Sequence, residues 1–157
     1  MKNNLAKRIA TVMFVVYLML LFYILFLYGE RVGNQFHLEV FAKEHLDMVN
    51  FIPFATVISF WKMIRNDSIN TDIVVRNIIA NLLMFMPMGM FGQILFREKF
   101  NKWWKNSMFV AGVVLLLEII QFFTFCGCAD IDDIILNTVG ATVGYGTIQL
   151  IRRYIDF

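Results

Sequence analysis

The chain has 157 residues, of which 59% are apolar and 16% aromatic, whereas soluble domains are roughly 45 to 50% apolar. Charged residues make up 17% and fall in clusters separated by long uncharged runs, which excludes a soluble enzyme, a disordered tail and a disulfide scaffold. The net charge of +2, with no Lys/Arg stripe between aromatic residues, indicates no nucleic-acid partner. We therefore expect an all-α integral membrane protein that forms a single domain over residues 1–157.

Four segments are long and apolar enough to cross the ~30 Å hydrocarbon core as helices. The predicted spans are residues 9–28, 78–96, 107–125 and 134–151. The first span follows Lys2, Lys7 and Arg8, and it is interpreted as an uncleaved signal anchor because its apolar run is too long for a signal peptide. In the second span, Pro87 followed by Gly89 predicts a kink.

The distribution of basic residues predicts the orientation of the chain. Nine of the 14 Lys and Arg residues lie in the N-terminal tail, the loop at 97–106 and the C-terminal tail, whereas the connection at 126–133 has none and carries three aspartates. Because short cytoplasmic loops are enriched in Lys and Arg, we expect a multi-pass plasma-membrane protein with both termini in the cytoplasm.

The long outer segment contains an amphipathic stretch at about 53–65. Its apolar residues recur at spacings of three and four, but it is too short to span the bilayer. The first interpretation is an interfacial helix on the outer side. A re-entrant hairpin is the alternative, because Pro53 suits a helix start and residues 51–61 are uncharged.

Several polar residues interrupt the predicted spans. A lone charge at mid-membrane costs ~2.5 to 3.5 kcal/mol, so Glu118 needs a partner or a hydrated cavity. The other polar residues are expected near the outer ends of the helices, with Arg76 just outside the second span as the nearest positive charge. This pattern predicts an outward-opening polar cleft, whose candidate ligand-binding residues are Arg76, Asn77, Asn81, Glu118, Gln121, Asp130 and Asn137.

Each of these residues also has a structural interpretation. Asn and Gln often join membrane helices by hydrogen bonds, and Glu118 could pair with Arg76. Asp132 and Asp133 occupy positions where a carboxylate favours a helix N-terminus, and capping is the preferred interpretation for Asp133. The sequence indicates a weaker structural role for Asp130, which makes it the better functional candidate of the three aspartates.

Two further motifs are interpreted without a catalytic or metal-binding role. Gly140 and Gly144 form a Gly-x-x-x-Gly pattern one turn after Asn137, so close helix packing is expected to bury Asn137. Cys126 and Cys128 are expected to be free thiols, since a lone Cys-x-Cys is a weak metal signal.

The motifs together resemble the VanZ-like family. They are Asn50-Phe51-Ile52-Pro53-Phe54, Arg76-Asn77-x-x-x-Asn81, Phe85-x-Pro87-x-Gly89, Glu118-x-x-Gln121 and the run from Asp130 to Gly140 that continues to Gly144-Tyr145. The resemblance covers residues 49–145 and implies a small membrane protein of mainly Gram-positive bacteria, linked to resistance to teicoplanin and related lipoglycopeptides. Many relatives carry an Arg shortly before the Asp-x-Asp-Asp motif, whereas residues 124–129 contain none.

Three hypotheses for the function follow. The first is non-enzymatic: an outer cleft that recognises a lipid-anchored ligand, such as a lipoglycopeptide or a cell-wall lipid intermediate, with no cofactor. The second is a membrane enzyme that acts on a phospholipid or polyprenyl phosphate, with Glu118 or Asp130 as base, or with a divalent cation held by Asp130, Asp132 and Asp133. The third is an accessory subunit whose polar helix faces are oligomer contacts. No catalytic residue is assigned, because the chain offers no ready nucleophile.

Overall fold

The computed structural model describes residues 4–28, 50–66, 71–124 and 129–154. Within these ranges every element is a helix, and the only strand-like feature is an isolated bridge between Asn50 and Asp130. The elements are α1 (Asn4–Phe22), the π-helical turn η1 (Tyr23–Tyr28), α3 (Ala55–Arg65), α4 (Thr71–Leu95), α5 (Trp103–Thr124) and α6 (Ile131–Tyr154).

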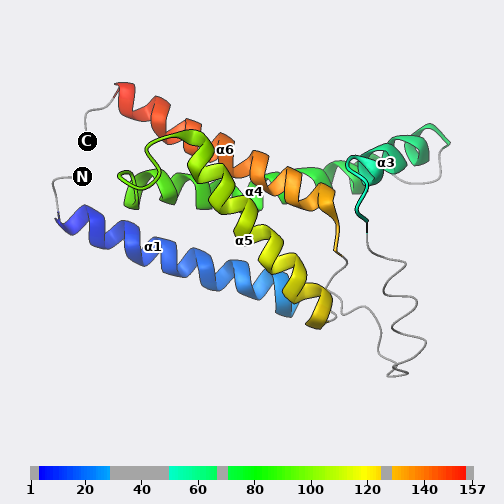
Figure 1. The fold of residues 1–157 in the computed structure, drawn as a ribbon, viewed down its shortest axis with the longest axis horizontal. Helices are drawn as coiled ribbons and strands as arrows, with labels where there is room; N and C mark the ends of the chain where they lie inside the picture. Colours follow the sequence, from blue (N-terminus) through cyan, green and yellow to red (C-terminus); the bar gives the residue numbers. More distant parts are fainter. Residues whose placement is uncertain (1–3, 29–49, 67–70, 125–128, 155–157) are drawn as a thin grey trace.

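Four of these helices are long and apolar enough to cross a membrane, as predicted: α1 with η1, α4, α5 and α6. They alternate in direction along the long axis of the molecule (Figure 1). The start of α1, the end of α6 and the connection between α4 and α5 lie at one end, which we call the basic end. The starts of α4 and α6 and the end of α5 lie at the other, which we call the acidic end.

Each predicted span overlaps one long helix, but every helix begins before its predicted start. Helix α4 begins at Thr71 instead of residue 78, so Arg76, expected just outside the second span, lies within the helix. Helix α3 begins at Ala55, and Pro53 precedes its N-cap residue Phe54. The error arises because polar residues at a helix end carry no apolar periodicity, although they continue the backbone hydrogen bonding.

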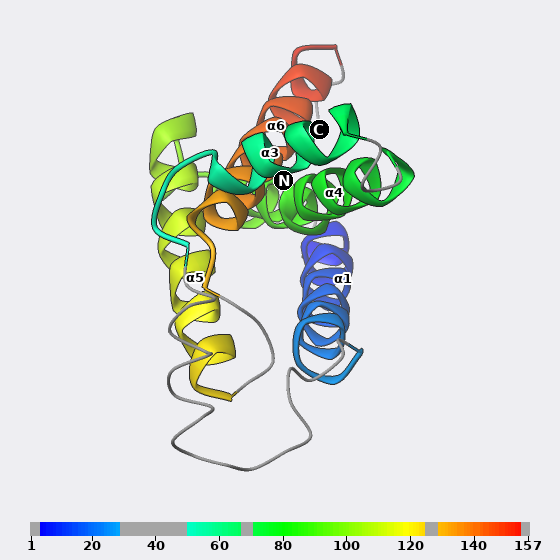
Figure 2. The ribbon, with the colours of Figure 1, turned by 90° about the vertical axis from the view of Figure 1, so that its right-hand side faces the viewer.

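The bundle is built around the pair α4 and α6, which pack side by side, while α1 and α5 lie to either side of them (Figure 2). Three glycines allow the two backbones to touch. A Cβ on Gly140 would overlap the carbonyl of Leu82, one on Gly144 would overlap that of Met86, and one on Gly89 would overlap that of Ala141. The predicted close packing of the Gly-x-x-x-Gly motif is therefore confirmed, and α4 contributes a glycine of its own.

The core lies where all four spans meet. Phe85 of α4, Val110 and Val114 of α5 and Ala141 of α6 are almost completely buried, and Leu21 of α1 joins their cluster. Because a lipid bilayer offers no hydrophobic driving force between helices, close packing of this kind must supply much of the attraction.

Pro87 lies inside α4, where it removes one backbone hydrogen bond of the preceding turn. Helix α1 packs against this turn, and the hydroxyl of Tyr17 donates to the carbonyl of Met84 over 2.9 Å. A neighbouring helix thus supplies a donor beside the proline, which is how membrane helices tolerate such residues.

We expect Tyr17→Phe to lower the free energy of unfolding by about 1 kcal/mol, since it removes a partly buried hydrogen bond between α1 and the turn before Pro87. Thermal unfolding of the purified protein in mild detergent measures the change. Tyr23→Phe is the matched control, because Tyr23 lies in η1 with its side chain half exposed. Equal unfolding temperatures for the two variants would contradict a role for Tyr17 at the proline.

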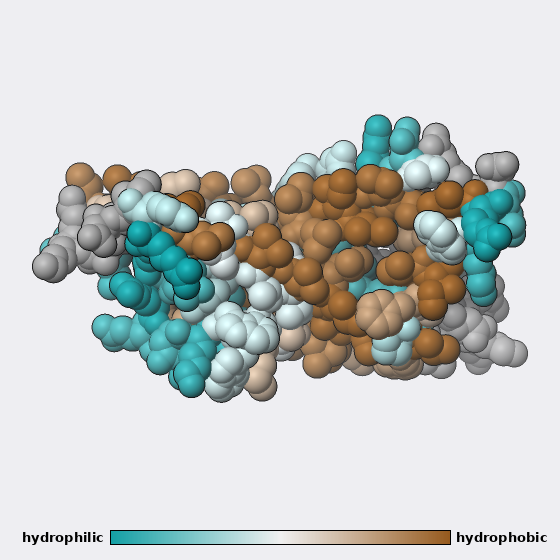
Figure 3. All heavy atoms as spheres, turned by 90° about the horizontal axis from the view of Figure 1, so that it is seen from above, coloured by the Kyte–Doolittle hydropathy of each residue, from teal (hydrophilic) through white to brown (hydrophobic). Residues whose placement is uncertain are grey.

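The surface fits a membrane environment. On the face seen from above, hydrophobic residues form a broad area over the middle of the molecule and hydrophilic residues gather toward its ends (Figure 3). Helix α3 contacts the start of α6 and lies beyond the bundle at the acidic end (Figure 1), with Ile58 and Trp61 exposed. This position favours the interfacial interpretation of α3, because a re-entrant segment would lie between the spans.

Candidate functional site at the acidic end

Two segments that are far apart in the sequence are joined at the acidic end by a short parallel bridge. The backbone N–H of Asn50 donates to the carbonyl of Ala129 (2.9 Å), and the N–H of Ile131 donates to the carbonyl of Asn50 (3.0 Å). The Asn50 side chain adds a hydrogen bond from Nδ2 to Oδ1 of Asp130 (3.0 Å). The bridge fixes the segment before α3 on the N-terminus of α6.

Asp132 ties α3 to α6. Its carboxylate accepts hydrogen bonds from the backbone N–H groups of Phe54 and Val57, and its side chain is 2% exposed. Phe54 is the N-cap of α3, has a left-handed φ of 65° and makes no side-chain cap of its own. Asp132 therefore satisfies the orphan donors of a helix 75 or more positions away, a task normally done by the N-cap residue itself.

Asp130, and not Asp133, acts as the cap of α6. Oδ1 of Asp130 accepts from the N–H of Asp132 (2.9 Å), in the geometry of an N-cap residue. Asp133 instead accepts a hydrogen bond from Nδ2 of Asn81 on α4. The capping role preferred for Asp133 from the sequence is thus filled by Asp130, which lies one residue before the helix and not inside its first turn.

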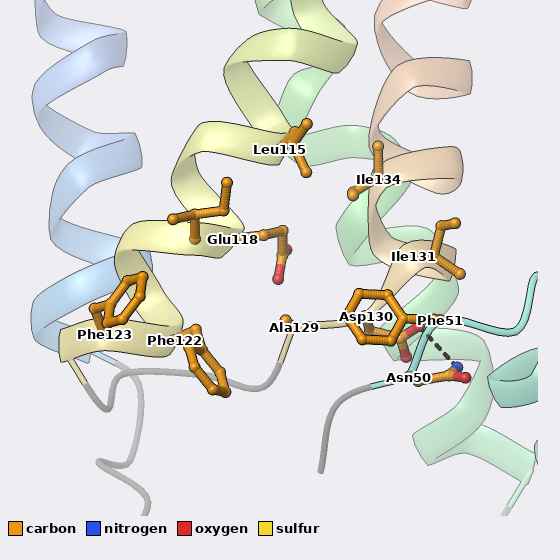
Figure 4. Close-up of a pocket in the computed structure, with 11 residues that line it drawn as sticks. Asn50, Phe51, Leu115, Glu118, Phe122, Phe123, Ala129, Asp130, Ile131 and Ile134 are labelled. Carbon is orange, nitrogen blue, oxygen red and sulfur yellow. Dashed lines mark hydrogen bonds between the residues drawn. The ribbon is translucent and has the colours of Figure 1, made fainter. Parts of the chain in front are cut away.

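A cavity of about 450 Å³ opens between the end of α5 and the start of α6. Most of its wall is apolar, and its polar groups are the side chains of Asn50, Glu118 and Asp130 (Figure 4). The apolar residues that line it include Phe51, Leu115, Ile119, Phe122, Phe123, Ile131 and Ile134. Leu115, Ile119 and Phe123 have large exposed fractions, so the cavity opens on the side of the bundle.

Glu118 is the most deeply placed charge of this cavity. Its side chain is 8% exposed and points from α5 into the space in front of Ala129 (Figure 4). Asp130 and Asp133 are near enough for their charges to act on it. Three carboxyl groups thus gather at the start of α6, a concentration of oxygen acceptors that favours hydrogen-bond donors and cations.

The remaining predicted ligand residues do not line the cavity. Arg76 and Asn77 lie on exposed positions of α4 and do not line the cavity. Nε2 of Gln121 donates to the carbonyl of Leu25 in η1 (3.1 Å), which joins α5 to the first span. Asn137 is 5% exposed, as expected from its place one turn before Gly140.

Sequence reasoning did not select Asn50 or Phe51 as site residues, yet both line the cavity. The signal was present, because both belong to the Asn50-Phe51-Ile52-Pro53-Phe54 motif on which the family resemblance rests. Their place beside Asp130 depends on the parallel bridge, and no local pattern encodes a pairing across 80 positions.

The three aspartates point to different partners: Asn50 for Asp130, the N-terminus of α3 for Asp132 and Asn81 for Asp133. Among the residues that the structure describes, no three His, Cys, Asp or Glu side chains are placed to hold a metal ion. Cys126 and Cys128 lie outside the described residues.

An apolar cavity with a few carboxylate and amide groups suits a ligand that joins a hydrocarbon chain to a polar head with hydroxyl or N–H donors. The cavity lies toward one end of the four long helices, between the last turns of α5 and the start of α6. These features define a multi-pass helical membrane protein with a cavity that opens on the side of the bundle.

The profile of the VanZ/LLP1 family matches residues 14–152, and the chain belongs to this family. The match covers α3, α4 and α5 completely and most of α1 with η1 and of α6. It therefore includes every residue that lines the cavity.

The chain is also similar to Protein VanZ of Enterococcus faecium, with 33% identity over 81 residues. The matched region covers 52% of this chain and 49% of that protein, so the chain spans about half the length of this curated relative. No solved structure matches the fold.

Proposed function

We propose that this protein modulates susceptibility to lipoglycopeptides of the teicoplanin type, without catalysis, by binding a lipid-anchored ligand in the cavity at the acidic end. The observation that carries the proposal is the cavity itself, in which Glu118 and Asp130 face a space with apolar walls. A lipoglycopeptide joins an acyl chain to a head rich in hydroxyl and amide groups, and both parts have a matching surface in the cavity.

The carboxylates determine which polar head fits. Glu118 and Asp130 accept hydrogen bonds from hydroxyl, amide or amine donors and repel a phosphate. Arg76, the positively charged residue among the predicted ligand-binding residues, lies outside the cavity lining. The ligand is therefore a donor-rich head on an apolar chain, and the acidic end is selective against anionic head groups.

The distribution of charge supports an extracytoplasmic position for this site. The acidic end lies opposite the connection between α4 and α5, which carries Arg97, Lys99, Lys102 and Lys105. By the positive-inside rule the basic end faces the cytoplasm, so the cavity faces the outer leaflet, where a lipoglycopeptide meets the membrane. Membership of the VanZ/LLP1 family and the likeness to Protein VanZ support the same role.

Glu118→Gln tests the carboxylate. The amide keeps the size of the side chain but replaces one carboxyl oxygen with an NH2 donor, which should weaken binding of a donor-rich ligand by about tenfold. In a strain that lacks the chromosomal copy, wild type should raise the minimal inhibitory concentration of teicoplanin, and Glu118→Gln should return it toward the value of the deletion strain. Membrane abundance of each variant is measured in parallel.

Asp72→Asn is the matched control, since it makes the same chemical change on an exposed acid of α4 that lines neither cavity. Leu115→Trp tests the volume of the cavity by adding bulk to its wall without altering charge, and it should also lower teicoplanin resistance. Full resistance in both Glu118→Gln and Leu115→Trp, at normal abundance, would refute the proposal.

The second candidate is a membrane enzyme that acts on a phospholipid or polyprenyl phosphate. One observation favours it: the carboxyl groups of Glu118 and Asp130 both lie in the wall of a single cavity, as an acid and a base would. Turnover of a labelled lipid by the purified protein, lost in Glu118→Gln, would support the enzyme. No turnover across a broad lipid panel, with divalent cations present, would dismiss it.

A further inference from the structure

A second cleft, of about 790 Å³, lies at the basic end and has a different character from the acidic cavity. It is formed by the end of α4, the connection to α5 and the end of α6. Arg97, Arg152 and Arg153 line it, together with one acid, Glu98. Asn101 and Gln149 add amide groups that can donate hydrogen bonds.

The arginines come from separate parts of the chain. Arg97 follows α4, whereas Arg152 and Arg153 belong to the last turn of α6, and the close packing of these two helices brings them together. Arg97 and Arg152 are near enough for their charges to interact. Like charges held close together favour an anion between them, and the planar guanidinium group matches the oxygen geometry of a phosphate.

Gln93 adds a second, independent observation. Its side chain is 5% exposed and lines the same cleft, and its Oε1 atom is buried without a hydrogen-bond partner among the described residues. A buried acceptor left in this state costs free energy. A ligand with a hydroxyl donor at this position would satisfy it.

We propose that the cleft at the basic end binds the phosphate group of an anionic glycerophospholipid whose head group carries hydroxyl donors, as phosphatidylglycerol does. The arginines hold the phosphate, and Gln93 accepts a hydrogen bond from the glycerol head. The cleft lies at the ends of α4 and α6, level with the head groups of the leaflet that faces this end. The site is separate from the acidic cavity, so it does not depend on the function proposed there.

The test uses the purified full chain in neutral detergent and measures its unfolding temperature during titration with short-chain lipids. Dihexanoyl phosphatidylglycerol should raise the unfolding temperature in a saturable manner, because a ligand that binds the folded state stabilises it. Dihexanoyl phosphatidylcholine and inorganic phosphate, at equal concentrations, should have much smaller effects.

Arg97→Gln should weaken the apparent affinity for phosphatidylglycerol about tenfold, by removing a charge-assisted contact. Lys99→Gln is the matched control, since Lys99 is exposed in the same connection, carries the same charge and does not line the cleft. Gln93→Leu should abolish the preference of the protein for phosphatidylglycerol over phosphatidylmethanol, which has the same charge but no hydroxyl group.

Three results would overturn the proposal. Equal stabilisation by phosphatidylcholine would show that the cleft does not recognise the net negative charge of the head group. Equal stabilisation by inorganic phosphate would show that the ligand of the cleft is a free anion and not a lipid. An equal loss of affinity in Arg97→Gln and Lys99→Gln would show that the lipid is attracted by the general surface charge and not by the cleft. None of these results bears on the teicoplanin phenotype of Glu118→Gln, so the two proposals fail separately.

Discussion

Gly140→Ala should destabilise the folded protein by about 1 to 3 kcal/mol, although alanine is the better helix former. The added Cβ would overlap the backbone carbonyl of Leu82 on α4. A backbone carbonyl cannot rotate away as a flexible side chain can, so the two helices must separate along their contact. Because this contact positions α6, the substitution should also displace the carboxyl groups at the start of α6.

Gly146→Ala is the control for this prediction. Gly146 lies on the same helix, and a Cβ added there would meet nothing within 4 Å, so the substitution should stabilise the protein by about 0.5 to 1 kcal/mol. Unfolding temperatures in mild detergent measure both variants, and opposite signs are expected. If Gly140→Ala proved as stable as Gly146→Ala, the close contact between α4 and α6 would be wrong.

Asp132→Ala should lower the free energy of unfolding by about 2 to 4 kcal/mol. It removes a buried carboxylate that accepts from the N–H groups of Phe54 and Val57, and both donors lose their partner. A left-handed conformation costs a residue other than glycine about 1 kcal/mol or more, and the contacts with Asp132 hold Phe54 in it. Without these contacts, Phe54 is expected to relax to an ordinary backbone conformation. We expect α3 to detach from the start of α6.

Hydrogen exchange at the first turn of α3 distinguishes this local effect from global unfolding. The amides of Phe54 and Val57 should exchange faster in Asp132→Ala, while those in the middle of α6 stay protected. Asp72→Ala makes the same change at an exposed position in the first turn of α4, where about 0.3 to 1 kcal/mol is expected. Unchanged protection of α3 in Asp132→Ala would show that another group anchors this helix.

The architecture was predictable from the sequence because each spanning helix carries its own signal. Four apolar runs of sufficient length predict four spans, and the structure confirms them. The contact at Gly140 and Gly144 was also predictable, since small residues spaced by four positions lie on one helix face. Helix ends were less accurate, as at Thr71, because polar end residues carry no apolar signal.

The candidate site was predictable only in part. A carboxylate in an apolar run indicates function or pairing by itself, and Glu118 does lie in the wall of a cavity. The roles of the three aspartates could not be assigned from spacing, because they depend on which backbone donors approach each of them. Asp132 meets Phe54 and Val57 only after the chain has folded back.

The sequence alone determined the class of membrane protein, the four segments long and apolar enough to cross and the end that carries the basic residues, because hydropathy and charge act locally along the chain. Tertiary structure decided the rest. It joined Asn50 to Asp130 in a parallel bridge, placed Glu118 opposite them across an apolar cavity and brought Arg97 beside Arg152. Such groupings depend on how closely α4 and α6 approach each other, and that distance is set by packing between helices.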